Sequence, residues 1–261
     1  MIYQEIVKVN YNHEIASGYW ETEFESELIS TESHPGQFIN ILPEKNWTNV
    51  MRRPMSVSHQ EEGILRIIYK VVGPGTQLMS NWKKGDSVDI IGALGNYWEN
   101  WENYHPVLIG GGVGIAPILN LHNHLKKLMV DHTLIMGART ENEHFLIHEP
   151  ENQIYLTTDD GSLGIHGNVL KAFNRVNYAE NLKIYSCGPA VMMEGVKTLA
   201  FEKNVPCDLA LERIMACGFG ICQGCTVERV INDEISSGYR KRFALACIDG
   251  PIFSAEDIIS C

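Results

Sequence analysis

Short apolar runs separated by turn-forming residues make up about the first 100 positions of the chain. These runs are rich in isoleucine and valine and are bounded by Gly, Pro or Asp, a pattern typical of β-strands. Several such strands in so short a region predict an antiparallel barrel. The runs are GQFINILP (36–43), RPMSVSHQ (53–60), GILRIIYKVV (63–72) and GDSVDIIGAL (85–94).

The pattern changes near residue 105, where strand-like and helix-like segments begin to alternate. The run HPVLIGGG (105–112) is typical of a buried strand that ends in glycines, and IAPILNLHNHLKKLM (115–129) carries apolar residues at helical spacing. Strand and helix in alternation predict a parallel α/β sheet. Further strands are expected at HTLIMGA (132–138), QIYLTTDD (153–160) and LKIYSCG (182–188).

From about residue 206 the chain continues with a cysteine loop, a polar stretch and the segment ALACIDGPIFSAEDI (244–258). Neither an internal repeat nor a low-complexity linker is visible. We therefore expect three parts: a β-barrel over 1–100, a parallel α/β domain over 101–205 and a small cysteine-bearing domain over 206–261.

Composition and charge narrow the functional classes. The chain has 261 residues and a net charge of −11 without a Lys/Arg-rich run, so a nucleic-acid surface is not expected. The start MIYQEIVKVN does not resemble a signal peptide, and no apolar run reaches the ~18 residues of a membrane helix. The seven cysteines are odd in number and cluster late, which favours thiolate chemistry over a disulfide scaffold. We expect a soluble cytoplasmic protein.

A glycine-rich turn joins a predicted strand to a predicted helix in LIGGGVGIAP (108–117). Glycines let the backbone approach a phosphate, and the helix N-terminus offers N–H groups. The turn departs from the usual dinucleotide fingerprint, because Pro117 holds its third glycine position and the next strand, TLIMGAR, lacks the expected acidic end. The candidate cofactor-binding residues here are Gly110, Gly111, Gly112 and Gly114.

The segment SCGPAVMMEGV (186–196) supports this reading, because Cys187 would lie at the carboxyl end of another parallel strand. Ligands of open α/β sheets bind at that edge. Cys187 is therefore a candidate for the reaction site, although a small buried cysteine without a chemical role is the alternative.

Two further pieces have chemistry that suits phosphate. Arg53, in RPMS, carries a planar and permanently charged fork, Pro54 fixes the backbone and Ser56 can bond a ring heteroatom. About twenty residues later, VGPGTQLM places Gly75 and Thr76 at the start of a short helix. Each piece is weak alone, since an Arg before a strand is usually a solvated charge.

The cysteine loop CGFGICQGC (217–225) carries the most specific spacing in the chain. Cys217, Cys222 and Cys225 form C-x₄-C-x₂-C, and Cys247 follows after 21 residues, as in plant-type iron–sulfur proteins. The intervening glycines let N–H groups point at sulfur. Structural zinc usually takes two short C-x₂₋₄-C units, and only one C-x₂-C is present here. The pattern favours [2Fe–2S] over [4Fe–4S], with zinc as the alternative.

The fourth cluster ligand has several candidates besides Cys247. Cys187 is already assigned to the nucleotide domain, Cys207 lies ten residues before the loop, and Cys261 is the final residue, where chains tend to be mobile. Cys247 sits in the apolar run FALACIDGPIF and follows the other three in the expected order. We therefore predict Cys217, Cys222, Cys225 and Cys247 as the metal ligands.

In this order, RPMSVS, GPGT, GALGN, GGGVGIAP and CGPAVMM resemble the ferredoxin–NAD(P)⁺ reductase superfamily. With LERIMACGFGICQGCTV and ACIDGPIF, the whole chain resembles the electron-transfer subunits of two-subunit, NAD-dependent dihydroorotate dehydrogenases. The visible departures are Ala93, where relatives often have Pro, and a long segment before the last ligand cysteine. The resemblance implies an FAD-binding barrel, an NAD-binding domain and Cys187 near the nicotinamide. It also implies these FAD contacts: Arg53, Pro54, Met55, Ser56, Ile68, Tyr69, Lys70, Gly75 and Thr76.

The same resemblance implies a partner, an FMN-containing catalytic subunit that oxidises dihydroorotate to orotate, in a heterotetramer with two copies of each chain. Electrons would pass from FMN through the cluster and FAD to NAD⁺. One alternative is a subunit of a ferredoxin- or sulfide-linked NAD(P)H oxidoreductase, which tends to have Asp where this chain has Cys217. Others are an oxygenase reductase, for which 56 residues after 205 are too few, and a zinc-binding module. NADP stays open, because Arg139 could hold a 2′-phosphate.

Overall fold

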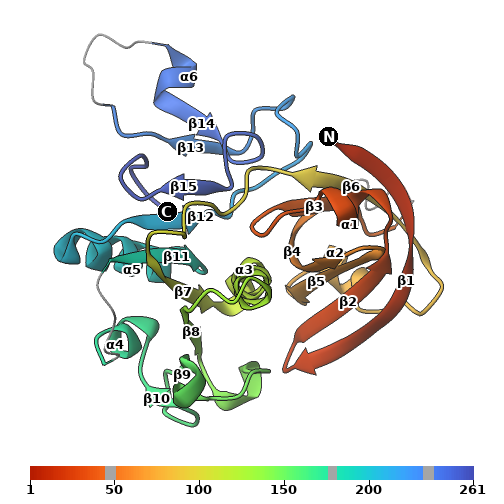
Figure 1. The fold of residues 1–261 in the computed structure, drawn as a ribbon. Helices are drawn as coiled ribbons and strands as arrows, with labels where there is room; N and C mark the ends of the chain where they lie inside the picture. The colour runs from red at the N-terminus through yellow and green to blue at the C-terminus, as the bar shows by residue number, and fades with distance from the viewer. Residues whose placement is uncertain (45–50, 176–180, 232–237) are drawn as a thin grey trace.

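A computed structural model of the chain describes residues 1–44, 51–175, 181–231 and 238–261. It has three parts (Figure 1): a β-barrel from the N-terminal third, an α/β sheet from the middle of the chain, and a C-terminal segment that contacts both. The predicted combination of an antiparallel barrel, a parallel α/β domain and a small C-terminal domain is confirmed.

The barrel is closed by six strands in the order β1-β2-β5-β4-β3-β6, and all neighbouring pairs are antiparallel. Alternation along each strand fills its interior: Leu65, Ile67 and Tyr69 point into the barrel core, whereas Ile68 packs against the sheet domain. The strands are β1 (Tyr3–Ala16), β2 (Tyr19–Glu25), β3 (Phe38–Leu42), β4 (Arg53–Glu61), β5 (Ile64–Lys70) and β6 (Ser87–Leu94).

Two short helices contribute apolar side chains to the barrel core. Ile29, from α1 (Leu28–Glu32), and Met79, from α2 (Pro74–Met79), are both fully buried there. α2 begins with Pro74, which suits the first turn of a helix because that position needs no N–H donor. The segment 72–76 is thereby held against the barrel.

The second part is a seven-stranded sheet in the order β10-β9-β8-β7-β11-β12-β15. Its first six strands are parallel to their neighbours, and β15 is antiparallel to β12. The strands are β7 (His105–Gly111), β8 (Thr133–Ala138), β9 (Ile154–Thr158), β10 (Ile165–His166), β11 (Leu182–Cys187), β12 (Cys207–Ala210) and β15 (Ile252–Ser254).

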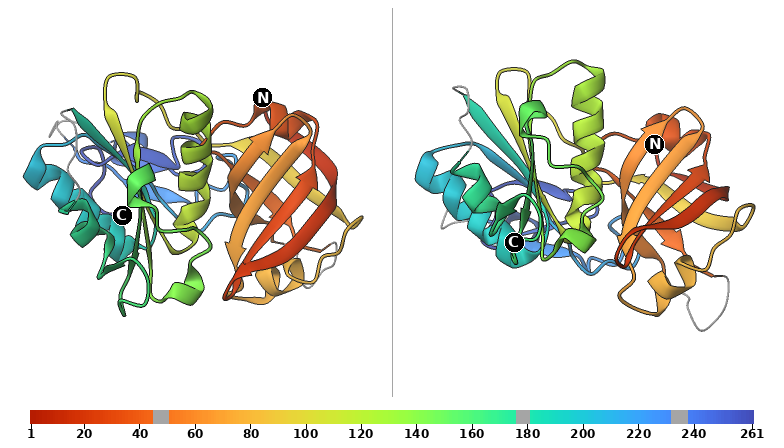
Figure 2. Two further views of the ribbon diagram at one scale, coloured as in Figure 1. Left: turned by 60° about the horizontal axis from the view of Figure 1, so that its bottom comes forward. Right: turned by 90° about the horizontal axis from the view of Figure 1, so that it is seen from below.

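Helices cover both faces of this sheet (Figure 2). α3 (Ile115–Lys127) lies between the sheet and the barrel, while α4 (Val169–Phe173) and α5 (Ala190–Lys203) lie on the other face. Side chains of successive β7 residues point to opposite faces of the sheet. Leu108 packs with α3, whereas Val107 and Ile109 pack with α4 and α5. Burial on both faces explains the continuous apolar run of this strand.

The C-terminal segment is not separate from the sheet. β15 pairs with β12, so the sheet runs across the boundary that we predicted at residues 205 and 206. This pairing covers an edge of β12 that would otherwise expose unpaired backbone groups. The rest of the segment contains turns and a two-stranded sheet, formed by β13 (Thr226–Glu228) and β14 (Phe243–Leu245), with α6 (Tyr239–Arg242) before β14.

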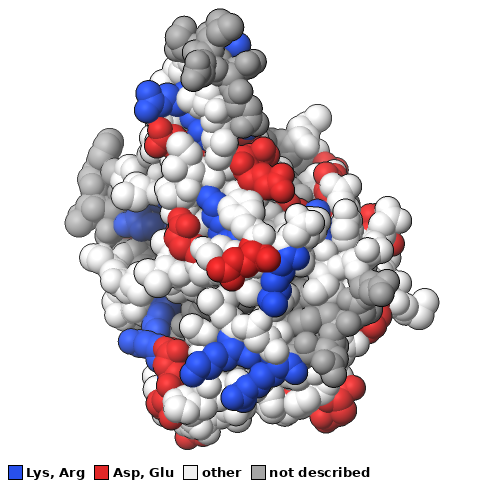
Figure 3. Space-filling view, turned by 90° about the vertical axis from the view of Figure 1, so that its left-hand side faces the viewer, with Lys and Arg blue, Asp and Glu red and all other residues white. Residues whose placement is uncertain are grey.

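Polar contacts tie the barrel to the sheet domain. The buried Asn120, on α3, donates from Nδ2 to the Val57 carbonyl of β4 at 3.0 Å. Lys70 Nζ lies 3.0 Å from Glu143 Oε1. None of the helices in the described ranges has the length and apolarity to cross a membrane. On the face shown in Figure 3, acidic and basic side chains are interspersed.

Candidate functional site

A cavity of about 730 Å³ lies where the barrel, the sheet domain and the C-terminal segment meet. This volume is in the range of small-molecule sites, roughly 300–1,000 Å³. Five of the predicted FAD contacts line it: Arg53, Pro54, Met55, Gly75 and Thr76. The opposite wall comes from the start of α5 and the segment after β12, and it includes Gly188, Ala190, Leu211, Ile214, Met215 and Cys261.

Arg53 and Gly75 are in close contact at the rim of this cavity. A Cβ atom at Gly75 would lie 2.6 Å from Arg53 Nε, so a side chain there would displace the guanidinium. Thr76 Oγ1 accepts hydrogen bonds from the Val72 and Gly73 N–H groups at 3.0 and 3.2 Å, which fixes the turn. The arrangement presents a cationic fork beside a rigid backbone turn, a chemistry that suits a phosphate.

The other predicted flavin contacts lie elsewhere in the described structure. The Tyr69 hydroxyl donates to Asn12 Oδ1 at 3.1 Å inside the barrel, and burial raises the pKa of Tyr69 to about 12. Ile68 packs against the sheet domain, and Lys70 is paired with Glu143. Ser56 is half-buried on β4, paired in register with Phe38. Flavin contacts by these residues stay predictions.

Glu143 also engages Arg139, the residue that we considered for a 2′-phosphate. Hydrogen bonds from the Arg139 guanidinium are the main cause that lowers the pKa of Glu143, to about 2. Partial burial of the carboxyl opposes this shift, and the hydrogen bond from Lys70 adds to it. The carboxylate is therefore ionised at neutral pH and joins a cation of each domain. Arg139 thus already has an anionic partner.

The glycine turn and Cys187 lie together at the carboxyl ends of β7 and β11. Cys187 pairs in register with Gly110. A Cβ atom at Gly114 would lie 2.3 Å from the Cys187 carbonyl oxygen, and one at Gly111 would lie 2.5 Å from Met192 Sδ. Gly112 has a φ of +55°, in the left-handed region that favours glycine. Contact with the Cys187 backbone therefore requires glycine at position 114, and backbone conformation favours it at position 112.

Cys187 is a protonated thiol at neutral pH. Burial, and then the charge of Glu212, raises its pKa to about 12. A thiol in this state is a poor nucleophile and a weak hydrogen-bond donor. Its place beside the glycine turn suits a group that shapes a pocket and does not react covalently.

The four predicted ligand cysteines form two pairs. Cys217 Sγ lies 3.4 Å from Cys222 Sγ, and Cys225 Sγ lies 3.2 Å from Cys247 Sγ. Cys222 is exposed, whereas Cys225 and Cys247 are buried. Of the remaining cysteines, Cys207 is buried in the sheet core and Cys261 lines the cavity.

Backbone N–H groups of the loop face the sulfur atoms. Burial raises the pKa of Cys217, but the N–H groups of Cys222, Phe219 and Ile221 outweigh it and bring the pKa to about 7. Burial and the neighbouring Cys225 thiol raise the pKa of Cys247 to about 12, while the Gly220 N–H opposes this shift. Because Gly220 belongs to the loop of the first pair, the two pairs are neighbours.

The arrangement in two thiol pairs suits a binuclear iron–sulfur cluster. A tetrahedral zinc site with metal–sulfur bonds of about 2.3 Å needs all its sulfur ligands around one point. Two thiol pairs, each suited to one iron, with N–H groups aimed at sulfur, are what a binuclear cluster requires.

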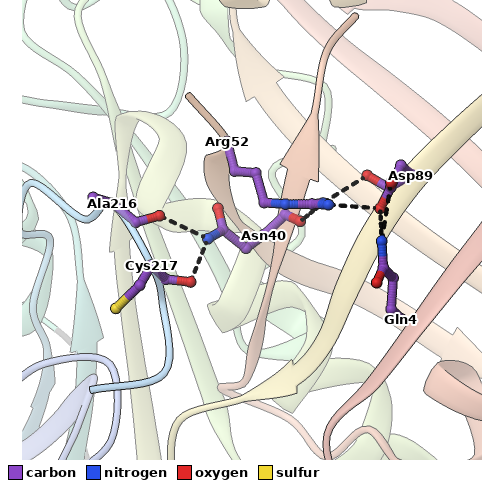
Figure 4. Close-up of polar contacts among 6 residues, drawn as sticks. All are labelled: Gln4, Asn40, Arg52, Asp89, Ala216 and Cys217. Carbon is purple, nitrogen blue, oxygen red and sulfur yellow. Dashed lines mark hydrogen bonds and ion pairs between the residues drawn. The ribbon is translucent and has the colours of Figure 1, made fainter. Parts of the chain in front are cut away.

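Our sequence analysis missed the residue that joins the loop to the barrel. Asn40, on β3, donates from Nδ2 to the carbonyls of Ala216 and Cys217 at 3.2 and 3.0 Å (Figure 4). The signal was visible, because Asn40 is the only polar residue in the apolar run FINIL. A buried polar side chain inside such a run usually has a specific hydrogen-bonding partner.

Comparisons with known proteins agree with this geometry. A model described as the iron–sulfur cluster binding domain of dihydroorotate dehydrogenase B matches residues 212–259, and an oxidoreductase NAD-binding domain matches 108–198. The electron transfer subunit of dihydroorotate dehydrogenase B (NAD(+)) from Caldanaerobacter subterraneus is 34% identical over 97% of both chains. Its counterpart from Fusobacterium nucleatum is 31% identical over 96% of both.

Solved structures show the same fold. A structure of an NADH-dependent reduced ferredoxin-NADP oxidoreductase, concerned with flavin-based electron bifurcation, has a TM-score of 0.82 and 30% identity, covering 97% of this chain and 90% of that one. A ferredoxin NADP+ reductase from Neisseria gonorrhoeae with bound FAD and NADP has a TM-score of 0.62 and 14% identity, over 77% and 91% of the two chains. It shares the fold alone.

The predicted cofactors, an iron–sulfur cluster, NAD and FAD, are those of the matched domain families and of the flavin-containing structural neighbours. The chain is accordingly an oxidoreductase with an electron-transport role. Because relatives above 30% identity cover nearly the whole chain, this protein belongs to the family of dihydroorotate dehydrogenase B (NAD(+)) electron transfer subunits.

Proposed function

We propose that this chain passes electrons between a catalytic partner subunit and NAD⁺, through a [2Fe–2S] cluster and FAD, during oxidation of dihydroorotate to orotate. One observation carries the proposal: the residues just before the cysteine loop line the cavity. Ile214 and Met215 line the cavity, and the ligand Cys217 follows two residues after Met215. A one-electron carrier would therefore lie beside the flavin pocket.

The cavity residues suit FAD. We assign the FAD phosphates to Arg53 and to the turn at Gly75 and Thr76, because the cationic fork lies against that turn. Pro54 and Met55 would contact the flavin from β4. When bound, FAD exchanges a hydride with nicotinamide and single electrons with an iron–sulfur centre. The chain's part in this chemistry is to hold the cofactors close together and exclude water.

We assign the nicotinamide cofactor to the edge formed by the glycine turn and Cys187. The cofactor would lie beside Gly110, Gly111, Gly112 and Gly114 at the ends of β7 and β11, where open α/β sheets bind their ligands. The most open of these positions is Gly112, where the nearest atom to an added Cβ would be 3.8 Å away. Cys187, protonated at neutral pH, would form part of the pocket wall without donating electrons itself. Arg139 is occupied by Glu143, which supports NAD over NADP.

We assign the cluster to Cys217, Cys222, Cys225 and Cys247. Their two-by-two arrangement supports one iron per thiol pair, and the spacing is that of plant-type [2Fe–2S] proteins. The chain holds the pairs together through loop N–H groups that lower the basicity of the sulfurs.

A partner subunit should complete the reaction. The names of the relatives describe an electron transfer subunit, which supports a separate catalytic chain. We propose that this chain is FMN-containing and that the complex holds two copies of each subunit. Location in the cytoplasm also stays a proposal, supported by seven cysteines that are all free in the structure.

One second candidate has an observation in its favour. The structural neighbour with a TM-score of 0.82 is an NADH-dependent reduced ferredoxin-NADP oxidoreductase. In that reading the partner would exchange electrons with ferredoxin and not with dihydroorotate. Cys217 favours the dihydroorotate reading, because ferredoxin-linked relatives tend to carry Asp at the first ligand position.

The test is an assay of the native complex. The chain is purified with its partner under anaerobic conditions, and NADH formation is followed with dihydroorotate or with reduced ferredoxin as the donor. We expect NADH with dihydroorotate, and a complex containing Cys247→Ser as the matched control should not form it. Activity with reduced ferredoxin alone would contradict the proposal and support the second candidate.

A further inference from the structure

Asn40 lies where the barrel meets the cluster loop. Its side chain is fully buried, and its Nδ2 bonds both the Ala216 carbonyl and the carbonyl of the ligand Cys217. The approach is close, because a Cβ atom at Gly218 would lie 2.8 Å from Asn40 Nδ2. Gly218 has a φ of +82°, so both conformation and space require glycine there.

The backbone of Asn40 is itself held rigidly. Asn40 pairs with Pro54 on β4 and with Ile91 on β6. Its carbonyl accepts a hydrogen bond from Arg52 Nη1 at 3.2 Å, and Arg52 Nη2 lies 2.7 Å from Asp89 Oδ1 (Figure 4). Gln4 Nε2 also donates to Asp89, at 3.0 Å. A network along the neighbouring strands β1, β6 and β3 therefore ends at the cluster loop.

The partner of Asn40 in register connects the loop to the flavin pocket. Pro54 lines the cavity, and Arg53, which follows Arg52, lies at its rim. Asn40 does not line the cavity among the described residues. It thus bonds to the first cluster ligand on one side and pairs with a wall strand of the flavin pocket on the other.

Burying the Asn40 side chain costs folding free energy that an apolar residue at this position would not cost. Its Oδ1 is buried and has no hydrogen-bond partner in the described part of the chain. Burying an unpaired polar oxygen is unfavourable, and an apolar residue would fill the same space on β3 without that penalty. The two N–H groups directed at the loop are what an apolar residue could not supply.

The segment that follows Cys247 is held by a second asparagine of the barrel region. Asn96 Nδ2 donates to the Ile252 carbonyl at 2.8 Å, and its Oδ1 accepts from the Ile252 N–H at 3.0 Å. Asn40 thus bonds the segment of the first thiol pair, whereas Asn96 bonds the segment that follows Cys247 of the second pair. Asn96 is a matched comparison for Asn40.

We propose that Asn40 is a positioning residue, whose carboxamide holds Cys217 against the strand pair β3–β4 and thereby sets the cluster's potential and its coupling to the flavin. The inference rests on the proposed function for the identity of the cluster. Hydrogen bonds and solvent exposure around the sulfur ligands determine the potentials of such clusters. The Asn40 N–H group partly neutralises the negative charge of the Cys217 carbonyl oxygen. A less negative surrounding stabilises the reduced cluster, which carries one more electron, and so raises its midpoint potential.

The test compares Asn40→Ala, Asn40→Asp and Asn40→Gln with the parent protein as purified. Asp keeps the size but lacks the N–H donors, whereas Gln keeps the donors on a longer side chain. We expect Ala and Asp to lower the midpoint potential of the cluster and alter its EPR spectrum, with up to a tenfold shift of the one-electron equilibrium, about 59 mV. Gln should restore part of the change.

Hydrogen exchange gives a readout that needs neither substrate nor turnover. Asn40→Ala should speed exchange over residues 215–222 but not over 247–253, and Asn96→Ala should do the reverse. Asn10→Ala is the control, because it also removes an asparagine of the barrel. Asn10 donates a hydrogen bond to Glu23, and neither residue belongs to the cysteine loop. FAD content shows whether each variant folds. If Asn40→Ala does not fold, Asn40→Gln or Asn40→Ser is measured in its place.

An unchanged potential, EPR spectrum and exchange over 215–222 in Asn40→Ala, with full FAD and iron content, would overturn the inference. Failure of the proposed function would look different. The parent complex would then not couple dihydroorotate to NAD⁺, yet the Asn40 variants would still shift the potential of the cluster.

Discussion

The Sγ atoms of Cys225 and Cys247 lie 3.2 Å apart, although the two residues are 22 positions apart in the sequence. Both thiols are buried, and the Ala246 N–H donates to the Cys225 carbonyl at 2.8 Å, which holds the two segments together. The fold of β13 and β14 thus brings Cys247, the fourth ligand that we propose, next to Cys225.

Replacing Cys247 should remove or distort the cluster. We predict that Cys247→Ser lowers the visible iron–sulfur absorption strongly, because serine is a poorer ligand for iron than thiolate. NADH should still reduce the flavin, since that step needs no cluster. Cys207→Ser and Cys261→Ser are the controls and should keep the full spectrum. Bleaching by Cys261→Ser, with Cys247→Ser unaffected, would mean that the ligands are assigned wrongly.

Arg53→Ala should weaken FAD binding. A charge-assisted hydrogen bond contributes roughly 1.5–3 kcal/mol, so we expect an affinity loss of about 10- to 100-fold. The measurement is FAD content after gel filtration, with iron content as a check that the rest of the chain is intact. Arg139→Ala, which removes an exposed arginine outside the cavity lining, is the matched control. Equal FAD retention in the two variants would contradict the assignment.

Gly112→Val should impair reduction of the flavin by NADH. The φ of +55° strains any residue with a side chain by about 1–2 kcal/mol, although the nearest atoms to a Cβ there are 3.8 Å away. Reduction by dithionite, which needs no nicotinamide site, should be spared. The comparison is a stopped-flow trace with each reductant, and equal NADH rates in variant and parent would remove Gly112 from the cofactor's path.

The buried pair His122 and His132 should make the protein less stable in acid. His122 Nδ1 lies 2.8 Å from His132 Nε2, and burial, helped by His132 and Lys126, lowers the pKa of His122 to about 4. Above pH 6.5 the ring is neutral in both states. As the pH falls from 6.5 towards 4, the unfolded chain gains a proton that the folded chain does not, so stability falls.

We expect His122 to account for about 2 kcal/mol of the difference in unfolding free energy between pH 7.5 and pH 5. His122→Asn cannot titrate and should reduce that difference by this amount. Urea unfolding, followed by tryptophan fluorescence at the two pH values, measures it. The same loss of stability in parent and variant would show that His122 does not cause the pH dependence.

The local pattern was sufficient for four of the six barrel strands, for the central strands of the sheet and for the helix α3, but it did not identify β1 and β2. β3, β5 to β9 and β11 fall within the predicted runs and β4 extends one residue beyond its run, because alternation and turn residues are local properties of the chain. The pairing of β15 with β12 was not predicted, since it depends on how the C-terminal segment folds back on the sheet. No local signal identifies such an edge pairing.

The structure brings predicted site residues together where their spacing or sequence context is specific, and their roles stay predictions. The cysteine spacing brought together the four thiols, and RPMS and GPGT brought Arg53, Met55 and Thr76 to one cavity. Tyr69 was selected by resemblance, but alternation along β5 places it in the barrel core with Leu65 and Ile67. Asn40 was missed, because its partners lie 176 and 177 residues further along the chain.

The most direct measurement of the proposed electron path is an anaerobic titration of the native complex with dihydroorotate in the absence of NAD⁺. We predict that dihydroorotate produces the EPR signal of a reduced [2Fe–2S] cluster and bleaches the FAD absorption, and that the isolated chain shows neither change. In the complex with Cys247→Ser, dihydroorotate should leave the FAD oxidised. Rapid formation of NADH from dihydroorotate by that cluster-deficient complex would contradict the path through the cluster.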